Sequence, residues 1–212
     1  MFTKFVTKIE MVSIEDKILQ RIEAFPKGEL FFPADFSELG SSEAVRLSLF
    51  RLEKEGVINR VAQGIYVRPK ESRIIGKLVP SAEEVAEVIA KRDRIRTVPT
   101  GSYALNALGL STQVPMNIVM LTDGSPREIK VGKRKIKFKK TTPKNLLAKG
   151  KISCLVIQAL KEIGKGKVKE DEEQKILELL KKEDEKDLKY DIGLAPVWIQ
   201  KIMKKALKDG KN

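Results

Sequence analysis

The chain has 212 residues, enough for two modest domains, and carries 42 Lys and Arg against 29 Asp and Glu, a formal net charge of +13. This charge favours polyanionic partners, and no apolar run approaches the roughly 20 residues that span a bilayer, so we expect no membrane contact. The chain contains no histidine, which removes the commonest general base and metal ligand, and we expect no enzymatic activity, catalytic residue, metal or cofactor.

The first forty residues predict two helices. The opening segment, residues 1–13, lacks the apolar stretch and cleavage site of a secretory signal, so we expect a cytoplasmic protein. Ser13 followed by Asp16 is typical of a helix start, and apolar residues then recur at helical spacing until Pro26. Pro33 begins a small second helix, which Gly40 ends.

A third helix and a β-hairpin follow. Ser41 or Ser42 caps a helix that runs to about Glu55 and ends at Gly56. Two β-prone runs at 57–61 and 65–67 are joined by a glycine turn. Three helices followed by a two-stranded wing are typical of the winged helix-turn-helix, whose third helix enters the major groove of DNA. We therefore predict a winged-helix DNA-binding domain over residues 1–70.

We expect the third helix and the wing to contact DNA. The helix start and its arginines would reach phosphates and base edges, and the wing tip would reach the minor groove. The candidate DNA-binding residues are Ser41, Ser42, Arg46, Arg51, Lys54, Arg60 and Gln63. Helix capping explains the two serines equally well, and a plain hairpin turn explains Gln63 equally well.

Two apolar residues depart from this pattern. A helical wheel centred on the stripe of Val45, Leu49 and Leu52 puts Leu47 and Phe50 on the outward side, where polar DNA contacts belong. Either the apolar stripe is broader than that, or these two residues form a patch for a dimer or another partner. Direct base reading by this face is therefore in doubt.

After a linker at 69–76, residues 77–212 predict a second domain. A helix starts after Pro80, a buried strand covers 117–121, and two strands at 127–131 and 135–139 alternate apolar with basic residues. The rest is helical, and its single cysteine, Cys154, is expected to be a small core residue. The predicted fold class is α+β: an N-terminal winged helix and a mixed α/β C-terminal domain with a small antiparallel sheet.

The charge is unevenly distributed. Residues 1–70 carry 11 basic and 10 acidic side chains, residues 127–151 carry 11 basic and one acidic, and residues 170–191 carry 5 basic and 10 acidic. Most of the net charge thus lies in the second domain. We expect a basic face there for a polyanionic partner such as nucleic acid, made of Lys130, Lys133, Lys135, Lys137 and Lys139, with plain solvation as the alternative.

Several segments carry a family resemblance. They are LSLFRLEKEGVINRVAQGIYVRP at 47–69, TGSYALNALGLSTQVP at 100–115, VMLTDGSPREIKVG at 119–132 and LAPVWIQKIM at 194–203. Together they resemble the AbiEi-like abortive-infection antitoxins, the antitoxin half of type IV toxin-antitoxin systems. The string NALGLSTQVP is the most specific of these matches.

The resemblance implies a DNA-binding repressor that regulates its own operon. Its partners would be duplex DNA of its own promoter and a cognate nucleotidyltransferase-like toxin. The second domain would oppose that toxin with or without a stable complex, and its basic face would meet the toxin or nucleic acid. Two other interpretations stay open. One is an unrelated winged-helix transcription factor with a ligand-sensing or RNA-binding second domain, and the other is a nucleic-acid-processing enzyme that uses the basic face.

Overall fold

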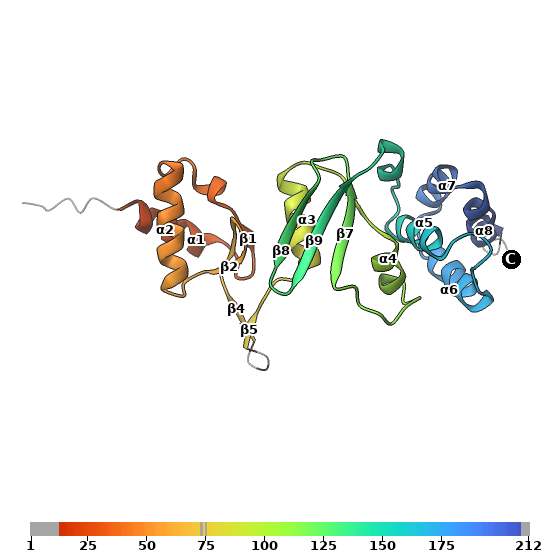
Figure 1. Ribbon diagram of the computed structural model, residues 1–212, viewed down its shortest axis with the longest axis horizontal. Coiled ribbons are helices and arrows are strands. Elements are labelled where there is room, and N and C mark those ends of the chain that lie inside the picture. The colour runs from red at the N-terminus through yellow and green to blue at the C-terminus, as the bar shows by residue number, and fades with distance from the viewer. Residues whose placement is uncertain (1–12, 73, 75, 209–212) are drawn as a thin grey trace, which may run out of the picture. The chain divides into compact units, whose positions relative to one another are not determined.

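The computed structural model describes residues 13–72, 74 and 76–208 (Figure 1). The chain divides into two compact units, Met1–Ser81 (unit 1) and Ala82–Asn212 (unit 2). Helices and strands occur in both units, which confirms the predicted α+β class. Within the described residues no helix is long and apolar enough to cross a membrane. Residues 1–12, which carry most of the segment behind the cytoplasmic expectation, lie outside the described residues.

Unit 1 combines two α-helices, a 3-10 helix and a three-stranded antiparallel sheet of order β1-β3-β2. Its first elements are α1 (Ile14–Ala24), β1 (Leu30–Phe31), the 3-10 helix η1 (Pro33–Phe36), α2 (Ser42–Lys54), β2 (Asn59–Ala62) and β3 (Ile65–Val67). Buried aliphatic and aromatic side chains from the helices and strands fill the space between them, including Ile18, Ile22, Phe31, Phe36 and Leu49. The core holds α2 against α1 and η1, and Tyr66 of β3 belongs to the same cluster.

Local capping explains where the helices of unit 1 begin and end. Ser13 and Asp16 form a reciprocal capping box at the start of α1, as their spacing predicts. Gly56, with φ of 76°, lies just beyond the end of α2, and its left-handed conformation lets the next N–H, of Val57, bond back to the Leu52 carbonyl at 3.0 Å.

Two predictions for unit 1 hold only in part. The short second helix is only the 3-10 turn η1, held by the Asp35 carboxylate, which accepts the Phe32 N–H at 2.8 Å. The expected linker at 69–76 instead contains paired strands, β4 (Lys70–Ser72) and β5 (Gly76–Leu78), which form an antiparallel ladder. Strand pairing gives these residues backbone hydrogen-bond partners. A pattern of apolar side chains does not predict such pairing between polar segments.

Unit 2 contains a four-stranded sheet, a helix packed against it and a group of further helices. Its elements are α3 (Ala82–Arg92), β6 (Thr97–Pro99), α4 (Gly101–Ala107), β7 (Asn117–Thr122), β8 (Arg127–Val131), β9 (Arg134–Lys140), the 3-10 helix η2 (Pro143–Leu146), α5 (Lys151–Ile163), α6 (Glu170–Leu180), α7 (Glu185–Leu194) and α8 (Val197–Lys208). The acidic stretch at 170–191 therefore covers α6 and most of α7, with a turn between the two helices.

The sheet of unit 2 is mixed, so the antiparallel description holds for only part of it. Its strand order is β6-β7-β9-β8, and β7 pairs with β9 in parallel. The β8–β9 hairpin and the β6–β7 pair are antiparallel. The short β8–β9 turn makes that hairpin, and β9 then inserts beside β7. Alternation within each strand predicts its faces but not this long-range pairing.

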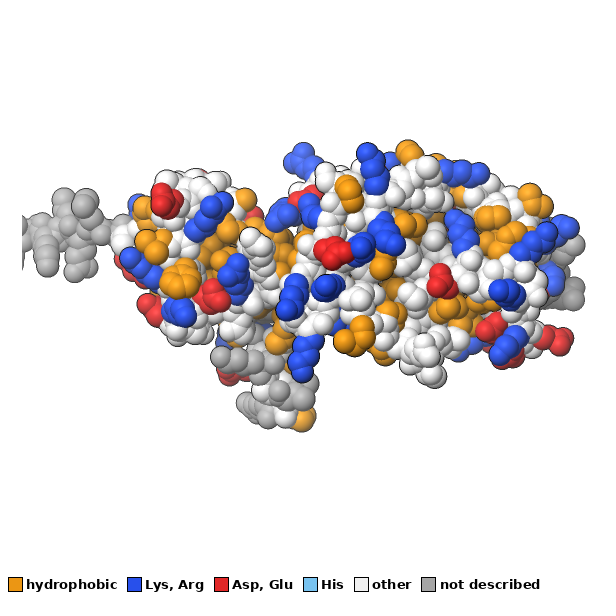
Figure 2. Space-filling model, in the orientation of Figure 1, with side chains coloured by type: hydrophobic (Ala, Val, Ile, Leu, Met, Phe, Trp, Pro, Cys, Tyr) orange, Lys and Arg blue, Asp and Glu red, His pale blue; other side chains and the backbone are white. Residues whose placement is uncertain are grey.

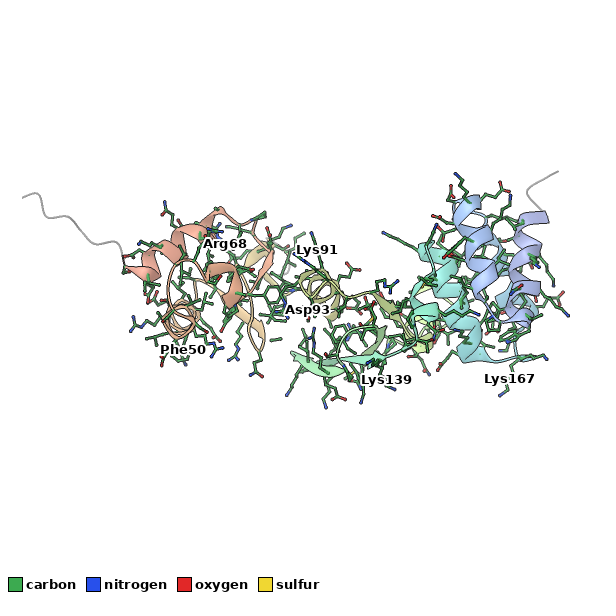
Figure 3. All side chains as sticks on the ribbon, turned by 90° about the horizontal axis from the view of Figure 1, so that it is seen from above. Phe50, Arg68, Lys91, Asp93, Lys139 and Lys167 are labelled. Carbon is green, nitrogen blue, oxygen red and sulfur yellow. The ribbon has the colours of Figure 1, made fainter. Side chains whose placement is uncertain are left out.

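The two faces of this sheet differ in chemistry. Ile118, Ile136 and Phe138 are fully buried on the face against which α3 packs. The intervening residues of β9, including Lys137 and Lys139, are exposed on the opposite face. Figure 3 shows Lys139 on the side of the sheet away from α3. The sheet therefore has one covered face and one open, basic face.

The helices α4 to α8 share a second core in unit 2, and α5 is central to it. Val156, Ala159 and Leu160 of α5 are fully buried together with residues of α4, α6, α7 and α8. The amino terminus of α5 lacks a side-chain cap of its own. Two distant carboxylates replace it: Asp191 accepts the Lys149 and Gly150 N–H groups, each at 2.9 Å, and Glu183 accepts two N–H groups of the first turn.

Glu183 accepts the Ile152 and Ser153 N–H groups at 2.6 and 2.9 Å. Asp191 is fully buried and also accepts the hydroxyl of Ser153. A Cβ on Gly150 would lie 2.5 Å from a Glu183 carboxylate oxygen, so only glycine fits between the helix start and its cap. The two carboxylates thus satisfy N–H groups that a helix start leaves open.

We expect Asp191→Asn to destabilise unit 2 by about 2 to 3 kcal/mol, because an amide cannot replace a charged acceptor of several hydrogen bonds. Urea unfolding followed by the fluorescence of Trp198, the only tryptophan in the chain, measures this change in unit 2. Glu178→Gln is the matched control, because Glu178 is exposed on α6 and should change stability by less than about 0.5 kcal/mol. Equal stability of the two variants would contradict the capping role.

Candidate nucleic-acid interface

Four of the predicted DNA-binding residues surround one groove in unit 1. Ser42 and Arg46 of α2, Arg60 of β2 and Gln63 of the β2–β3 turn line a groove of about 660 Å³. The other residues that line it are Pro33, Ala34, Ser37, Gly40, Val45, Phe50, Gly64 and Tyr66. The structure thus brings residues from two separate segments of the sequence to one concave surface.

The start of α2 and the hairpin position these side chains. Ser41 caps α2 by accepting the Ala44 N–H at 3.2 Å, which places Ser42, Arg46 and Phe50 one turn apart along one side of the helix. Arg60 lies directly opposite Tyr66 in the sheet. The register shifts between Arg60 and Ala62, and this irregularity precedes the turn that carries Gln63.

The other three predicted DNA-binding residues do not line the groove. The Ser41 hydroxyl is engaged as the helix cap. Arg51 forms an ion pair with Glu15 of α1 at 3.3 Å, and the Lys54 ammonium lies 5.5 Å from the centre of the Phe50 ring. Arg51 therefore ties α2 to α1, while Lys54 extends the same exposed surface beyond Phe50.

The sequence pattern did not identify Phe50 as a groove residue. Its side chain is 51% exposed, and Figure 3 shows it pointing away from the body of unit 1. Leu47 is equally exposed, at 50%, but does not line the groove. The broader-stripe explanation was therefore wrong for both residues. The i, i+4 spacing from Arg46 to Phe50 was the signal that could have placed Phe50 beside the groove.

The predicted basic face of unit 2 is the open face of the mixed sheet. Lys130 of β8 pairs directly with Lys135 of β9, so two positive charges face each other across the ladder. Lys137 differs from Lys130 and Lys135, because it forms an ion pair with Glu128 at 2.5 Å. Figure 2 shows basic side chains gathered over this part of unit 2. Like charges opposite each other destabilise a sheet, and an anionic partner would relieve that cost.

A comparison with known protein families covers both units. The family model described as "Family of unknown function (DUF6088)" matches residues 17–188, which include the groove and the basic face. The chain belongs to this family. No curated protein matches it.

This DUF6088 chain also has a cavity within unit 2. It holds about 530 Å³ and lies between α3, the β6–β7 strands and the start of α5. Apolar side chains form part of its lining, and Tyr103, Glu87, Lys151 and Cys154 also border it. Burial and the nearby carboxylates of Glu83 and Glu87 raise the pKa of Tyr103, so its hydroxyl stays neutral and can donate a hydrogen bond.

The thiol of Cys154 is predicted to be unreactive at neutral pH. Burial, followed by the charge of Asp191, raises its pKa to about 11, and the thiolate is the reactive form. Alkylation by iodoacetamide at pH 8 should be roughly a hundredfold slower in the folded than in the urea-unfolded protein, and should accelerate about tenfold per pH unit toward pH 11. A folded-state rate equal to the unfolded rate at pH 8 would contradict this prediction.

Proposed function

We propose that this DUF6088 protein is a cytoplasmic DNA-binding repressor whose unit 1 acts as a winged helix on its own promoter. Helix α2 would enter the major groove, and the β2–β3 hairpin would contact the backbone or minor groove beside it. The observation that carries the proposal is the single groove that Ser42, Arg46, Arg60 and Gln63 line together. Arginine and polar side chains on one concave surface suit phosphates and base edges.

The near neutrality of residues 1–70 is compatible with this function because at least three acidic groups are engaged in contacts within the fold. Glu15 pairs with Arg51, Glu38 pairs with Arg21, and Asp35 accepts a backbone N–H. By contrast, Arg46 and Arg60 form no ion pair among the described residues. Positive charge is thereby left at the groove although the unit as a whole carries little net charge.

Arg46→Ala and Arg60→Ala should each weaken binding of the full chain to its promoter duplex by about 1 to 3 kcal/mol if each arginine contacts a base, and by less if it contacts a phosphate. Fluorescence anisotropy at one fixed salt concentration measures the change. Arg51→Ala is the matched control, because it removes one arginine from the same helix but not from the groove. Equal affinities of all three variants and the unchanged protein would rule out this groove as the DNA face.

The resemblance to AbiEi-like antitoxins extends the proposal to toxin neutralisation by unit 2. Its open sheet face carries Lys130, Lys135 and Lys139 without an ion pair among the described residues, and such a surface attracts anions. We propose that this face opposes a nucleotidyltransferase-like toxin, by contacting either an acidic toxin surface or the toxin's nucleic-acid substrate. The two activities would then reside in separate units.

The chain should no longer protect cells that express the cognate toxin when Lys130, Lys135 and Lys139 are all changed to Glu. Survival should fall roughly tenfold or more, because charge reversal costs several kcal/mol across an interface. A triple Lys→Glu change at the exposed Lys186, Lys201 and Lys204 is the control with the same net charge. The Arg46→Ala, Arg60→Ala double variant should still protect. Full protection by the sheet variant would remove this face from the proposal.

The cavity of unit 2 favours a second candidate, a winged-helix regulator that senses a small molecule. Its volume of about 530 Å³ lies within the range of ligand pockets, and its lining mixes apolar side chains with a few polar groups. Cys154 borders the cavity, so a bound compound should slow its alkylation. A compound that also changes promoter affinity would support this candidate over neutralisation.

A further inference from the structure

Phe50 occupies an unusual place for a large aromatic side chain. It is half exposed on the outward side of α2, while Val45, Leu49 and Leu52 of the same helix are buried on the opposite side. This ring lines a groove together with arginine and glutamine side chains, so a ligand seated in the groove would bury it, which is strongly favourable. The structure places this ring in the wall of the groove that unit 1 presents.

The surroundings of the ring restrict the kind of partner. Arg46 precedes Phe50 by one turn and lines the same groove, and the Lys54 ammonium lies 5.5 Å from the ring centre. A partner that suits both the ring and the cations offers a small apolar group within an anionic surface. In the major groove of DNA, the 5-methyl group of thymine is such a group, and it lies between two phosphate backbones.

A second copy of this chain fits less well. A stable interface buries about 800 Å² on each partner, whereas the exposed large apolar side chains of α2 are only Leu47 and Phe50. Leu47 also lies outside the groove, so the two side chains do not combine into one concave apolar patch. The groove combines an aromatic wall with arginine and glutamine, which matches a base edge better than a copy of the same helix.

We propose that Phe50 is a specificity-determining residue that reads a thymine through its 5-methyl group. This inference rests on the proposed function, since it requires α2 to enter the major groove. Arg46 and Arg60 would hold the duplex through its phosphates or a neighbouring base, and the ring of Phe50 would cover the methyl group and exclude water from it. Affinity for the correct site would then depend on one methyl group that uracil lacks.

The test begins with a duplex selected from a random DNA pool by the full-length protein at fixed salt. Each thymine of that duplex is then replaced by uracil, one at a time, which removes only the methyl group. We expect affinity to fall about fourfold at one or two positions, the effect of one buried methyl group. Phe50→Ala should bind the thymine and uracil duplexes equally well.

Leu47→Ala is the matched control, because Leu47 is on the same helix and equally exposed but lies outside the groove. It should keep the preference for thymine. Far-ultraviolet circular dichroism establishes that both variants retain their helices. Failure of the unchanged protein to select any duplex would overturn the proposed function itself. Selective binding in which every uracil is accepted as well as thymine, or in which Phe50→Ala keeps the preference, would overturn only the role of Phe50.

Discussion

The amino terminus of α5 depends on two carboxylates, of Glu183 and Asp191, that lie 30 to 41 residues further along the chain than the N–H groups of Gly150, Ile152 and Ser153 that they accept. Asp191 and Glu183 accept the N–H groups that begin this helix, and α5 supplies the central buried side chains of the helical part of unit 2. The same carboxylates therefore join the segment that leaves the sheet to the helices that follow it. The buried carboxylate of Asp191 is stabilised there because the Lys149 and Gly150 N–H groups and the Ser153 hydroxyl donate to it.

In unit 1 the corresponding constraint is that several acidic side chains form contacts within the fold, whereas arginine side chains line the groove. Glu15 holds Arg51, Asp16 caps α1 and Asp35 caps η1, so these acidic groups serve the fold. The apolar side of α2 is buried, which fixes the direction in which Arg46 and Phe50 point. A nearly neutral unit can in this way present a groove lined by arginine, and the distribution of charge matters more than its sum.

The two units differ in the kind of surface that they offer. Unit 1 presents a concave groove with an aromatic wall, whereas unit 2 presents an open sheet face with lysines opposite one another across the strands. Shape and apolar contact suit discrimination between base sequences, and a flat array of lysines suits a less specific attraction to anions. The proposed division between promoter recognition and toxin neutralisation follows from this difference.

The sequence by itself determined the features that depend on neighbouring residues. The capping box of Ser13 and Asp16, the end of α2 at Gly56 and the alternating faces of β9 all follow from residues within a few positions of one another. These local rules predicted the α+β class, most element positions and the candidate residues at the start of α2 and in the hairpin.

Only the tertiary structure decided which distant residues meet. The parallel pairing of β7 with β9, the capping of α5 by Asp191 and the groove shared by Arg46, Arg60 and Phe50 join segments far apart in sequence. The hydrophobic pattern could assign Phe50 to neither a core nor a site, because exposure depends on what the rest of the fold leaves uncovered. Local propensity fixes the elements, whereas long-range packing selects among the ways in which those elements can be arranged.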